Sequence, residues 1–365
     1  MTSEDLRWLD AAVALAKPLL GTTADNPTVG AIVVDPKAQA ILGQGVTAAG
    51  GRPHAEPQAL GIAGLAARGA TLYVTLEPCH HWGRTPPCVD AVLASGVKRV
   101  VIGMVDPDPR TAGESVKRLA AAGIDVLVAD HPPSRRLHEG FAKRVATGRP
   151  FITVKLAVSA DGMIGRADQG NVPITGAGAR HWTHLQRAMV DAVMVGGRTA
   201  LIDDPLLTVR IPSLESRTPL RVILAGSEPL DSHLNLLGQS SAYPTAIIAS
   251  SGAKMNSFPS IELIEVTGQG ARPDLLAATL ALGSRGIQNV LVEAGARLAE
   301  ALLSANLADR FALLTSPTAI VGPAGIPATV FGTIEDRIAA AGLVEVDRRA
   351  LDGDMVTTYE RPSVQ

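Results

Sequence analysis

The chain has little of several things that define whole classes of protein. Aromatic residues make up only 3% of its 365 residues, and cysteine occurs twice. Lys and Arg total 33 against 35 Asp and Glu, so a nucleic-acid partner, which favours a basic surface, is not expected. No apolar run reaches about eighteen residues, and none follows the acidic start Met1-Thr-Ser-Glu-Asp5. We therefore expect a cytoplasmic protein without a membrane partner.

What is present indicates a core-forming chain of more than one domain. Apolar residues supply 46% of the sequence and charged residues 19%. At roughly 150 residues per domain, the length predicts about two domains. A charged helical stretch over 134–146 is broken by Thr147-Gly148-Arg149-Pro150. We place the boundary there, which gives domains of 1–146 and 147–365.

Apolar strand-like runs alternate with helical runs in both domains. In the first domain, strands are expected at 29–34, 71–76, 97–104 and 124–129, and helices at 6–20, 54–68, 86–95 and 114–122. In the second, strands are expected at 151–158, 192–195, 220–224, 245–248, 262–266 and 289–293, helices at 179–189, 274–282 and 297–304, and a closing hairpin at 343–349 and 354–361. This alternation predicts largely parallel sheets with helices on their faces.

The two cysteines, Cys79 and Cys88, point to a metal. Nothing indicates export, so a disulfide is a poor expectation, and metal binding or catalysis competes with two simply buried thiols. Together with His54 they form a donor set suited to zinc. Three protein ligands leave a fourth position for water, the pattern of a catalytic site, whereas a structural site would also recruit His80 or His81.

Glu56 lies two residues after His54 and is a candidate proton carrier. A zinc ion lowers the pKa of its bound water toward roughly 7, and a nearby carboxylate can pass the water's proton to a leaving amine. The alternative is an ordinary surface glutamate. The order His-x-Glu followed by Pro-Cys matches the zinc nucleobase-deaminase signature, although eight residues rather than two separate Cys79 from Cys88.

The segment resembles the bifunctional deaminase–reductase family of riboflavin biosynthesis. The motifs that carry the resemblance are Thr-Leu-Glu-Pro-Cys at 75–79, His81, Gly-Arg-Thr-Pro-Pro-Cys at 83–88, Asn-Pro-Thr-Val-Gly at 26–30 and Asp-Pro-Asp-Pro at 106–109. The resemblance implies a cytidine-deaminase-like three-layer αβα domain followed by a dihydrofolate-reductase-like α/β domain. It also implies one Zn²⁺ per chain, held by His54, Cys79 and Cys88, with Glu56 as the catalytic proton carrier.

The same resemblance implies how the deaminase substrate is bound. Asn26 would meet the pyrimidine edge, His81 would line the pocket, and Arg84 would offer its donors to the ribose phosphate. Two residues depart from the family pattern, His80 where Ser is usual and Asp108 where Asn is usual. An extra carboxylate repels a phosphorylated substrate, so Asp108 is expected either to turn away or to pair with a cation.

Glycine-rich strand ends mark the second domain, but no Gly-x-Gly-x-x-Gly follows a strand, so a Rossmann fold lacks its signal. Gly196-Gly197 ends one expected strand, and Glu293-Ala294-Gly295 leads from another into a helix whose N-terminus can bind a phosphate. Ordinary strand-to-helix turns are the alternative.

For this domain the resemblance implies a reductase that uses NADPH. Family substrate positions fall on Lys155, Arg187, Leu207, Arg210 and Glu293, and cofactor positions on Thr175, Thr199, Asp203 and Gly295. The three cations suit a ribose phosphate, with salt-bridged surface residues as the alternative. Two departures lie on the cofactor side, Asn171-Val172-Pro173 in place of Ser-x-Trp and Ala225-Gly226 in place of Asp-Ser.

The sequence therefore predicts a bifunctional enzyme. It would deaminate 2,5-diamino-6-(5-phosphoribosylamino)pyrimidin-4(3H)-one and then reduce the ribosyl group to ribityl with NADPH. A zinc deaminase whose second domain binds nucleotide without reducing it is the main alternative. A polynucleotide deaminase is disfavoured by the near-neutral charge, and a non-catalytic zinc module is the remaining alternative. A small phosphorylated pyrimidine is the expected partner, and we expect a homo-oligomer.

Overall fold

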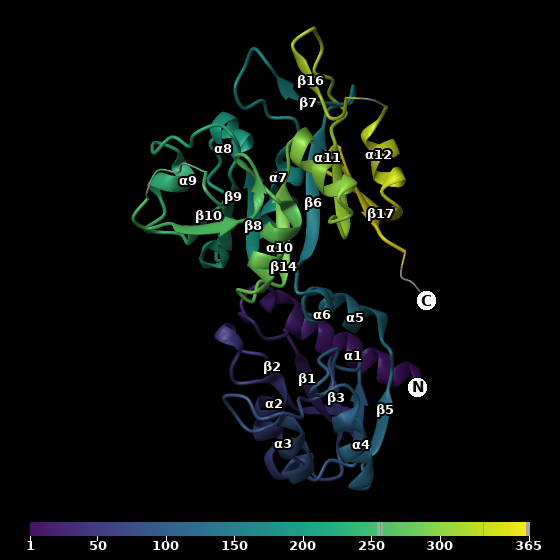
Figure 1. The fold of residues 1–365 in the computed structure, drawn as a ribbon. Helices are drawn as coiled ribbons and strands as arrows, with labels where there is room; N and C mark the ends of the chain where they lie inside the picture. Colours follow the sequence, from purple (N-terminus) through teal and green to yellow (C-terminus); the bar gives the residue numbers. More distant parts are fainter. Residues whose placement is uncertain (254–255, 257, 331, 363–365) are drawn as a thin grey trace. The chain divides into compact units, whose positions relative to one another are not determined.

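The computed structural model describes residues 1–253, 256, 258–330 and 332–362. The chain divides into two compact units, Met1–Gly148 and Arg149–Gln365, each with its own sheet and its own core (Figure 1). Within the described part of the chain, the search for a helix of sufficient length and hydropathy to cross a bilayer finds none.

The first unit is built on a five-stranded sheet. In sheet order its strands are β2 Ala40–Val46, β1 Gly30–Asp35, β3 Thr71–Val74, β4 Arg99–Ile102 and β5 Asp125–Val128. Strands β3, β4 and β5 are parallel, whereas β1 is antiparallel to both of its neighbours. The expectation of a largely parallel sheet is thus correct for the half formed by β3, β4 and β5, and wrong for the half that contains β1 and β2. Strand β2 was not predicted from the sequence.

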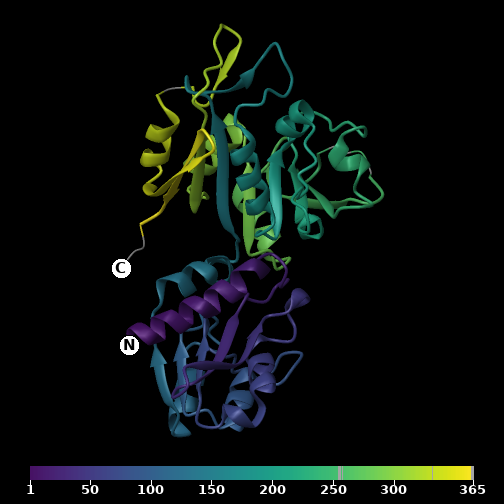
Figure 2. The same cartoon turned by 180° about the vertical axis from the view of Figure 1, so that it is seen from behind.

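Helices cover both faces of this sheet and make the three-layer αβα arrangement. The helices are α1 Ser3–Ala16, α2 Ala55–Ala63, α3 Cys88–Ser95, α4 Glu114–Ala121, α5 Pro132–Leu137 and α6 Glu139–Thr147. Alternate residues of β1 serve the two faces: Val33 packs in the core with α2 and α3, and Ile32 packs with α1 on the other side. Seen from behind, the purple helix α1 lies across the sheet (Figure 2). The single connecting helix expected at 134–146 is two helices, α5 and α6.

Strand β2 lies directly against α2, and two glycines allow this. A Cβ added to Gly43 would collide with the carbonyl oxygen of Ala59, and one added to Gly45 would collide with that of Ala55. The backbones of strand and helix therefore approach more closely than any side chain permits. This contact fixes the height of α2 above the sheet, and α2 begins immediately after His54.

The second unit is built on a nine-stranded sheet. In sheet order its strands are β11 Glu262–Val266, β10 Thr245–Ser250, β9 Leu220–Leu224, β8 Ala192–Gly196, β14 Asn289–Glu293, β6 Phe151–Val158, β15 Arg310–Thr315, β18 Asp354–Glu360 and β17 Val344–Leu351. The first seven are parallel, and β18 and β17 continue the sheet antiparallel. All six predicted strands and the predicted hairpin are confirmed, whereas the interior strand β15, between β6 and β18, was not predicted.

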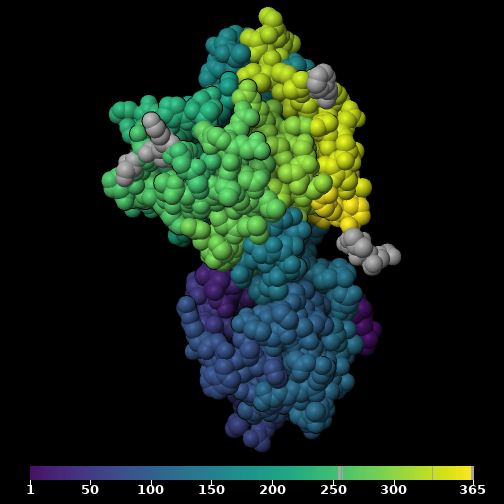
Figure 3. Space-filling model, in the orientation of Figure 1, coloured from purple at the N-terminus to yellow at the C-terminus, as the bar shows by residue number. Residues whose placement is uncertain are grey.

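Helices and short ribbons complete this unit. The helices are α7 Ala177–Arg187, α8 Gly197–Asp203, α9 Asn235–Gly238, α10 Leu275–Gly283, α11 Ala296–Ser304 and α12 Ile334–Ala340. The two-stranded ribbons pair β7 Met163–Arg166 with β16 Gly325–Pro327, and β12 Gly268–Gln269 with β13 Arg272–Pro273. In the space-filling view, the teal atoms around β7 meet the yellow-green atoms around β16 at the end of the unit (Figure 3).

Candidate active sites

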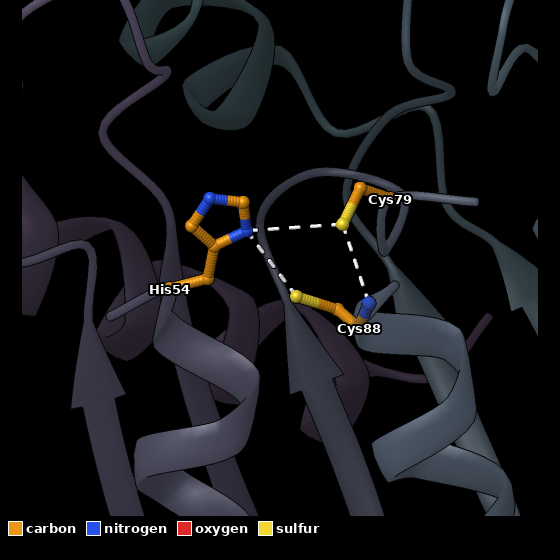
Figure 4. Close-up of side chains that lie close together, drawn as sticks. All are labelled: His54, Cys79 and Cys88. Atoms are coloured by element: carbon orange, nitrogen blue, oxygen red, sulfur yellow. Dashed lines mark hydrogen bonds between the residues drawn. The ribbon is translucent and has the colours of Figure 1, made fainter. Parts of the chain in front are cut away.

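Three ligand-type side chains converge in the first unit. His54 caps α2, Cys88 opens α3, and Cys79 lies in the loop that follows β3. Nδ1 of His54 lies 3.3 Å from Sγ of Cys88 and 3.8 Å from Sγ of Cys79 (Figure 4). All three ligand atoms lie within 4.8 Å of one another. One imidazole nitrogen and two sulfurs at this spacing fit a tetrahedral zinc ion.

No fourth protein ligand accompanies this cluster within the part of the chain that the structure describes. Among the residues that the structure describes, His54, Cys79 and Cys88 are the one group of three or more His, Cys, Asp or Glu side chains placed to hold a metal. Neither His80 nor His81, the ligands that a structural site would add, belongs to it. The donor set therefore has the composition of a catalytic zinc site, with a position left for water.

The electrostatics of the cluster favour a thiolate. Hydrogen bonds from the Cys88 thiol and from His54 lower the pKa of Cys79 to about 4, against the opposing effect of burial. Sγ of Cys79 also accepts the main-chain N–H of Cys88 at 3.2 Å. The shared hydrogen bond and burial raise the pKa of Cys88. Because zinc binds thiolates, the site already holds one sulfur in the ligating form.

Glu56 is enclosed in the first turn of α2, with 3% of its surface exposed. Burial raises the pKa of this carboxyl group to about 7, and the negative charge on Cys79 adds to the effect. A group whose pKa lies near neutrality can both accept and release a proton at physiological pH. The structure thus places Glu56 beside the cysteine cluster and away from bulk solvent, unlike an ordinary surface glutamate.

Arg52 connects the two segments that carry the ligands, a role that the sequence did not suggest. Its Nη1 lies 3.2 Å from Nε2 of His54 and donates to Oγ1 of Thr85 at 2.8 Å. Thr85 belongs to the loop that precedes Cys88. An arginine two residues before a ligand carries no signal in the sequence, because its partner is far away along the chain.

Glu77 organises the far side of the cluster and was also missed. It is 2% exposed, and its two oxygens accept four main-chain N–H groups. The donors are Asp106, Gly113, Ser115 and Val116. Glu77 therefore ties the segment that leads into α4 to the loop that carries Cys79. Its place within the motif around Cys79 was the available signal.

The predicted deaminase substrate residues lie within or against the segments that carry the ligands. Asn26 is half-buried, and its amide packs against Gly51, close in sequence to His54. Nδ1 of His81 lies 3.3 Å from Oγ1 of Thr111, which fixes one side of the ring. Arg84 is exposed in the loop before Cys88. An exposed guanidinium at this place suits the phosphate end of a substrate rather than its ring.

Asp108, the departure from the family pattern, is paired with a cation. Nε of Arg110 donates to both carboxylate oxygens, at 2.9 and 3.0 Å, and Nη2 also donates to Oδ2. This ion pair lowers the pKa of Asp108. Of the two arrangements expected from the sequence, the second is the one observed, so the extra carboxylate is neutralised.

A cleft of about 1060 Å³ opens in the second unit. Five of the predicted residues line it: Lys155, Thr175, Thr199, Asp203 and Gly295. It lies at the carboxyl ends of the parallel strands, where open α/β sheets bind ligands. A Cβ on Gly295 would approach Oγ1 of Thr199 to 3.1 Å, so the start of α11 faces α8 closely. The free N–H groups in the first turn of α11 can bind a phosphate.

A network of charges lies beside this cleft. Arg187 donates to both oxygens of Glu293, at 2.5 and 2.9 Å. Glu293 is the register partner of Lys155 on β6. Burial lowers the pKa of Lys155, while the negative charge of Glu293 opposes that shift. Burial raises the pKa of Asp203, and Lys155 opposes it. Of the four residues in this network, Lys155 and Asp203 line the cleft.

Four predicted substrate residues do not line the cleft itself. Arg187 and Glu293 are occupied with each other, and the side chain of Leu207 lies in the core with 1% exposure. Arg210 is exposed, and its main-chain N–H donates to Nδ1 of His184 at 3.2 Å. Leu207 can therefore meet a substrate only through its main chain, which has a φ of 54°.

One of the two departures on the cofactor side borders the cleft, because Asn171, Val172 and Pro173 form part of its wall. Gly226, in the other departure, is not among the lining residues. It lies against Gly197, since a Cβ on Gly197 would come within 3.3 Å of the nitrogen of Gly226.

Two family profiles match the chain, one in each unit. The profile described as the cytidine and deoxycytidylate deaminase zinc-binding region matches residues 2–104. The profile described as the RibD C-terminal domain matches residues 150–337, just over half of the chain.

Relatives of the same kind match along nearly the whole length. The riboflavin biosynthesis protein RibD of Synechocystis sp. is 37% identical over 357 residues, which covers 97% of this chain and 95% of the relative. The RibD of Escherichia coli is 37% identical over 329 residues, covering 86% and 88%.

Solved structures give the same result. RibD of Acinetobacter baumannii superposes with a TM-score of 0.86 at 32% identity, covering 99% of both chains. A diaminohydroxyphosphoribosylaminopyrimidine deaminase/5-amino-6-(5-phosphoribosylamino)uracil reductase of Thermotoga maritima superposes with a TM-score of 0.84 at 29% identity, covering 98% of this chain and 99% of the other.

Proposed function

The chain belongs to the RibD family of riboflavin biosynthesis proteins, bifunctional enzymes that join a deaminase to a reductase, and from this premise we propose its substrate and its residue roles. The substrate is 2,5-diamino-6-(5-phosphoribosylamino)pyrimidin-4(3H)-one. The first unit removes one amino group by hydrolysis, and the second reduces the ribosyl group of the product to ribityl with NADPH. The observation that carries the proposal is the convergence of His54, Cys79 and Cys88 beside the buried Glu56.

In the deamination, His54, Cys79 and Cys88 hold one Zn²⁺, which supplies a nucleophilic water at neutral pH when it is bound. Glu56 accepts the proton of that water and delivers it to the departing amine, so ammonia leaves without a proton from bulk solvent. A pKa of about 7 lets Glu56 perform both transfers in one cycle.

Three further residues bind the substrate in this unit. Asn26 can donate to and accept from the pyrimidine edge, and His81, held by Thr111, lines the ring. Arg84 meets the ribose phosphate, which suits its exposed position in the loop before Cys88.

In the reduction, Thr175, Thr199, Asp203 and Gly295 bind NADPH, whose nicotinamide supplies the hydride. The first turn of α11 receives a cofactor phosphate. Lys155, Arg187 and Arg210 form the cationic side that receives the substrate phosphate, with Glu293 and the main chain of Leu207 completing the site. The cleft of about 1060 Å³ supports this assignment, because its volume is of the order of cofactor sites.

We propose further that the enzyme works in the cytoplasm as a homo-oligomer and binds no nucleic acid. The net charge of −2 supports the last point, because a polyanion partner favours a basic surface. A second domain that binds nucleotide without reducing it is not favoured, since the family to which the chain belongs pairs the two activities.

A mass-spectrometric time course tests the proposal. The zinc-loaded chain is incubated with the diaminopyrimidine ribosyl phosphate, alone, with NADPH or with NADH. Hydrolytic exchange of an amine for oxygen adds about 1 dalton without any nicotinamide. Reduction adds about 2 daltons more, and only with the reduced cofactor.

Two controls separate the activities. Glu56→Gln is expected to remove the first mass shift while it retains zinc, and to reduce pre-formed deaminated substrate at the wild-type rate. Removal of zinc with a chelator is likewise expected to abolish the first mass shift and to leave the reduction of pre-formed deaminated substrate unchanged. A first shift that survives in Glu56→Gln would contradict the role of this residue, and a missing first shift in the wild type would contradict the substrate.

A further inference from the structure

Arg221 is the largest fully buried side chain in the protein's described residues. It lies on β9 with 0% of its surface exposed. No carboxylate among the described residues contributes to its electrostatics, and burial lowers its pKa to about 10. Burying a cation without a counter-ion costs considerable free energy unless hydrogen bonds replace its hydration. An apolar residue of similar size would fill the same space without that cost.

The two terminal nitrogens of the guanidinium are instead bound by oxygen atoms from separate segments, whereas Nε has no hydrogen-bond partner among the described residues. Nη1 donates to the carbonyl of Leu206 at 3.2 Å. Nη2 donates to the carbonyls of Leu236 and Tyr243 at 3.0 and 3.2 Å, and to Oγ1 of Thr245 at 2.5 Å. The ring of Tyr243 also lies 5.3 Å from the guanidinium carbon. The planar fork of an arginine is suited to bind several acceptors at once.

One of these contacts holds a strained piece of backbone. Leu206 precedes Leu207, whose φ of 54° lies in the left-handed region that a leucine rarely adopts. Such a conformation persists only where surrounding contacts enforce it. The bond from Arg221 fixes the carbonyl on one side of Leu207, and the buried Leu207 side chain fixes the residue itself.

The next two alternate residues are held in the same way. The carbonyl of Thr208 accepts from Nη1 of Arg187 at 2.8 Å, and the N–H of Arg210 donates to Nδ1 of His184 at 3.2 Å. Side chains from β9 and α7 thus form hydrogen bonds with the main chain at Leu206, Thr208 and Arg210. What the segment presents at its end is the guanidinium of Arg210, which is exposed.

We propose that Arg221 is a positioning residue of the reductase site. It fixes the main chain at Leu206 and so determines where Arg210 places its guanidinium for the substrate phosphate. Arg221 itself never reaches a ligand, since it is enclosed. This inference rests on the proposed function, in which Arg210 binds that phosphate.

A double-mutant cycle in the full-length, zinc-loaded chain tests it, with Arg221→Lys, Arg210→Ala and the combination. Lysine keeps the charge but not the fork, so it cannot hold Leu206, Leu236 and Thr245 together. Arg221→Lys is expected to raise the reductase KM for the deaminated substrate by about tenfold, with kcat changed less than about twofold. In the Arg210→Ala background, the same substitution is expected to raise KM no further, because coupled residues are not additive.

Two additional measurements keep the outcome decisive. Calorimetric titration with ribose 5-phosphate measures phosphate binding without catalysis. The affinity is expected to fall in Arg221→Lys and to fall no further when this substitution is added to Arg210→Ala. Thr245→Val removes one of the groups that hold Arg221 and is expected to shift KM in the same direction by a smaller factor, even if Arg221→Lys unfolds the second unit. The deaminase rate of each preparation serves as the internal control.

An unchanged KM and unchanged ribose 5-phosphate affinity in Arg221→Lys would overturn the proposal, as would additive effects of the two substitutions. A loss in Arg221→Lys together with no loss in Arg210→Ala would also overturn it, because Arg221 would then act through another group. Failure of the proposed function looks different: the wild type would not reduce the substrate, while the calorimetric cycle would still report on the placement of Arg210.

Discussion

Arg187 and Glu293 form a two-pronged ion pair in which the side chains are only 9% and 15% exposed. The pair connects the end of α7 to the end of β14. Although burial raises the pKa of a carboxyl group, the charge and hydrogen bonds of Arg187 hold the pKa of Glu293 below its usual value. The carboxylate is therefore charged and compensated by Arg187, while burial lowers the pKa of the neighbouring Lys155, which lines the cleft.

Glu293→Gln is expected to destabilise the second unit by about 3–5 kcal/mol, because it leaves a buried arginine without its counter-ion. Denaturant unfolding followed by a probe in the second unit measures this. Glu345→Gln is the matched control, since its partner Arg348 is 57% exposed and such pairs contribute about 1 kcal/mol or less. Equal effects of the two substitutions would contradict the idea that enclosure of the pair matters.

Arg110→Ala is expected to raise the deaminase KM for the phosphorylated substrate by roughly threefold to tenfold, since about 1 kcal/mol of repulsion corresponds to a factor near five. The substitution leaves the carboxylate of Asp108 unpaired close to His81. Asp108→Asn removes the negative charge that Arg110 neutralises, so no unpaired carboxylate remains, and the substitution is expected to change KM less. The double variant should recover most of the loss; if it does not, Arg110 contacts the substrate directly.

His138 makes the stability of the first unit depend on pH. It is 1% exposed, and burial lowers its pKa to about 3 from the ordinary 6.5. Between these pH values the unfolded chain binds a proton that the folded chain does not. The contribution of His138 to the free energy of unfolding is therefore fully present above pH 6.5 and falls as the pH drops toward 3. The loss between pH 7.5 and 5.5 is expected to be about 1.4 kcal/mol.

The test compares the unfolding free energies of the wild type and His138→Gln across this pH range at equal zinc loading. Glutamine can still donate to Oγ1 of Thr75, the partner of Nε2 of His138 at 3.0 Å. The variant should show a flatter pH profile. Parallel profiles would mean that another group controls the dependence.

Gly226→Ser is expected to lower the KM for NADPH by roughly twofold to tenfold, the effect of one hydrogen bond of about 1 kcal/mol. A Cβ at this position meets no atom within 4 Å, so the new side chain fits without displacement. Gly226→Ala adds the Cβ without the hydroxyl and is expected to leave the KM unchanged. An equal gain from both variants would assign the effect to backbone stiffness instead.

Strands and helices could be predicted where turn residues delimit an apolar run, and could not be predicted where the apolar pattern suits more than one kind of element. Strand β15 follows the Ala- and Leu-rich helix α11 after a few residues, and its own Phe-Ala-Leu-Leu core suits either a helix or a buried strand. Strand β2 contains two glycines, which read as a loop. In both cases the deciding factor is the neighbouring backbone in three dimensions, which a local pattern does not contain.

The candidate site divides in the same way. The three proposed zinc ligands and Glu56 stand in short local motifs, so their residue types and spacing could suggest their chemistry. Glu77 also stands in one of these motifs, but Arg52 and Arg221 could not be found in this way, and none of the three revealed its partners. Each acts through partners from other elements of the fold, and their residue types are common on any protein surface.

The close contact of β2 with α2 makes two residues without side chains part of the deaminase. A methyl group at Gly43 or Gly45 would push α2 outward and carry His54 and Glu56 with it, while Cys79 and Cys88 stayed in place on other elements. Random mutagenesis that scores metal affinity should therefore find positions in a plain edge strand as intolerant as the ligands. The distance between the segment that carries His54 and the elements that carry the two cysteines therefore depends on the absence of side chains at Gly43 and Gly45.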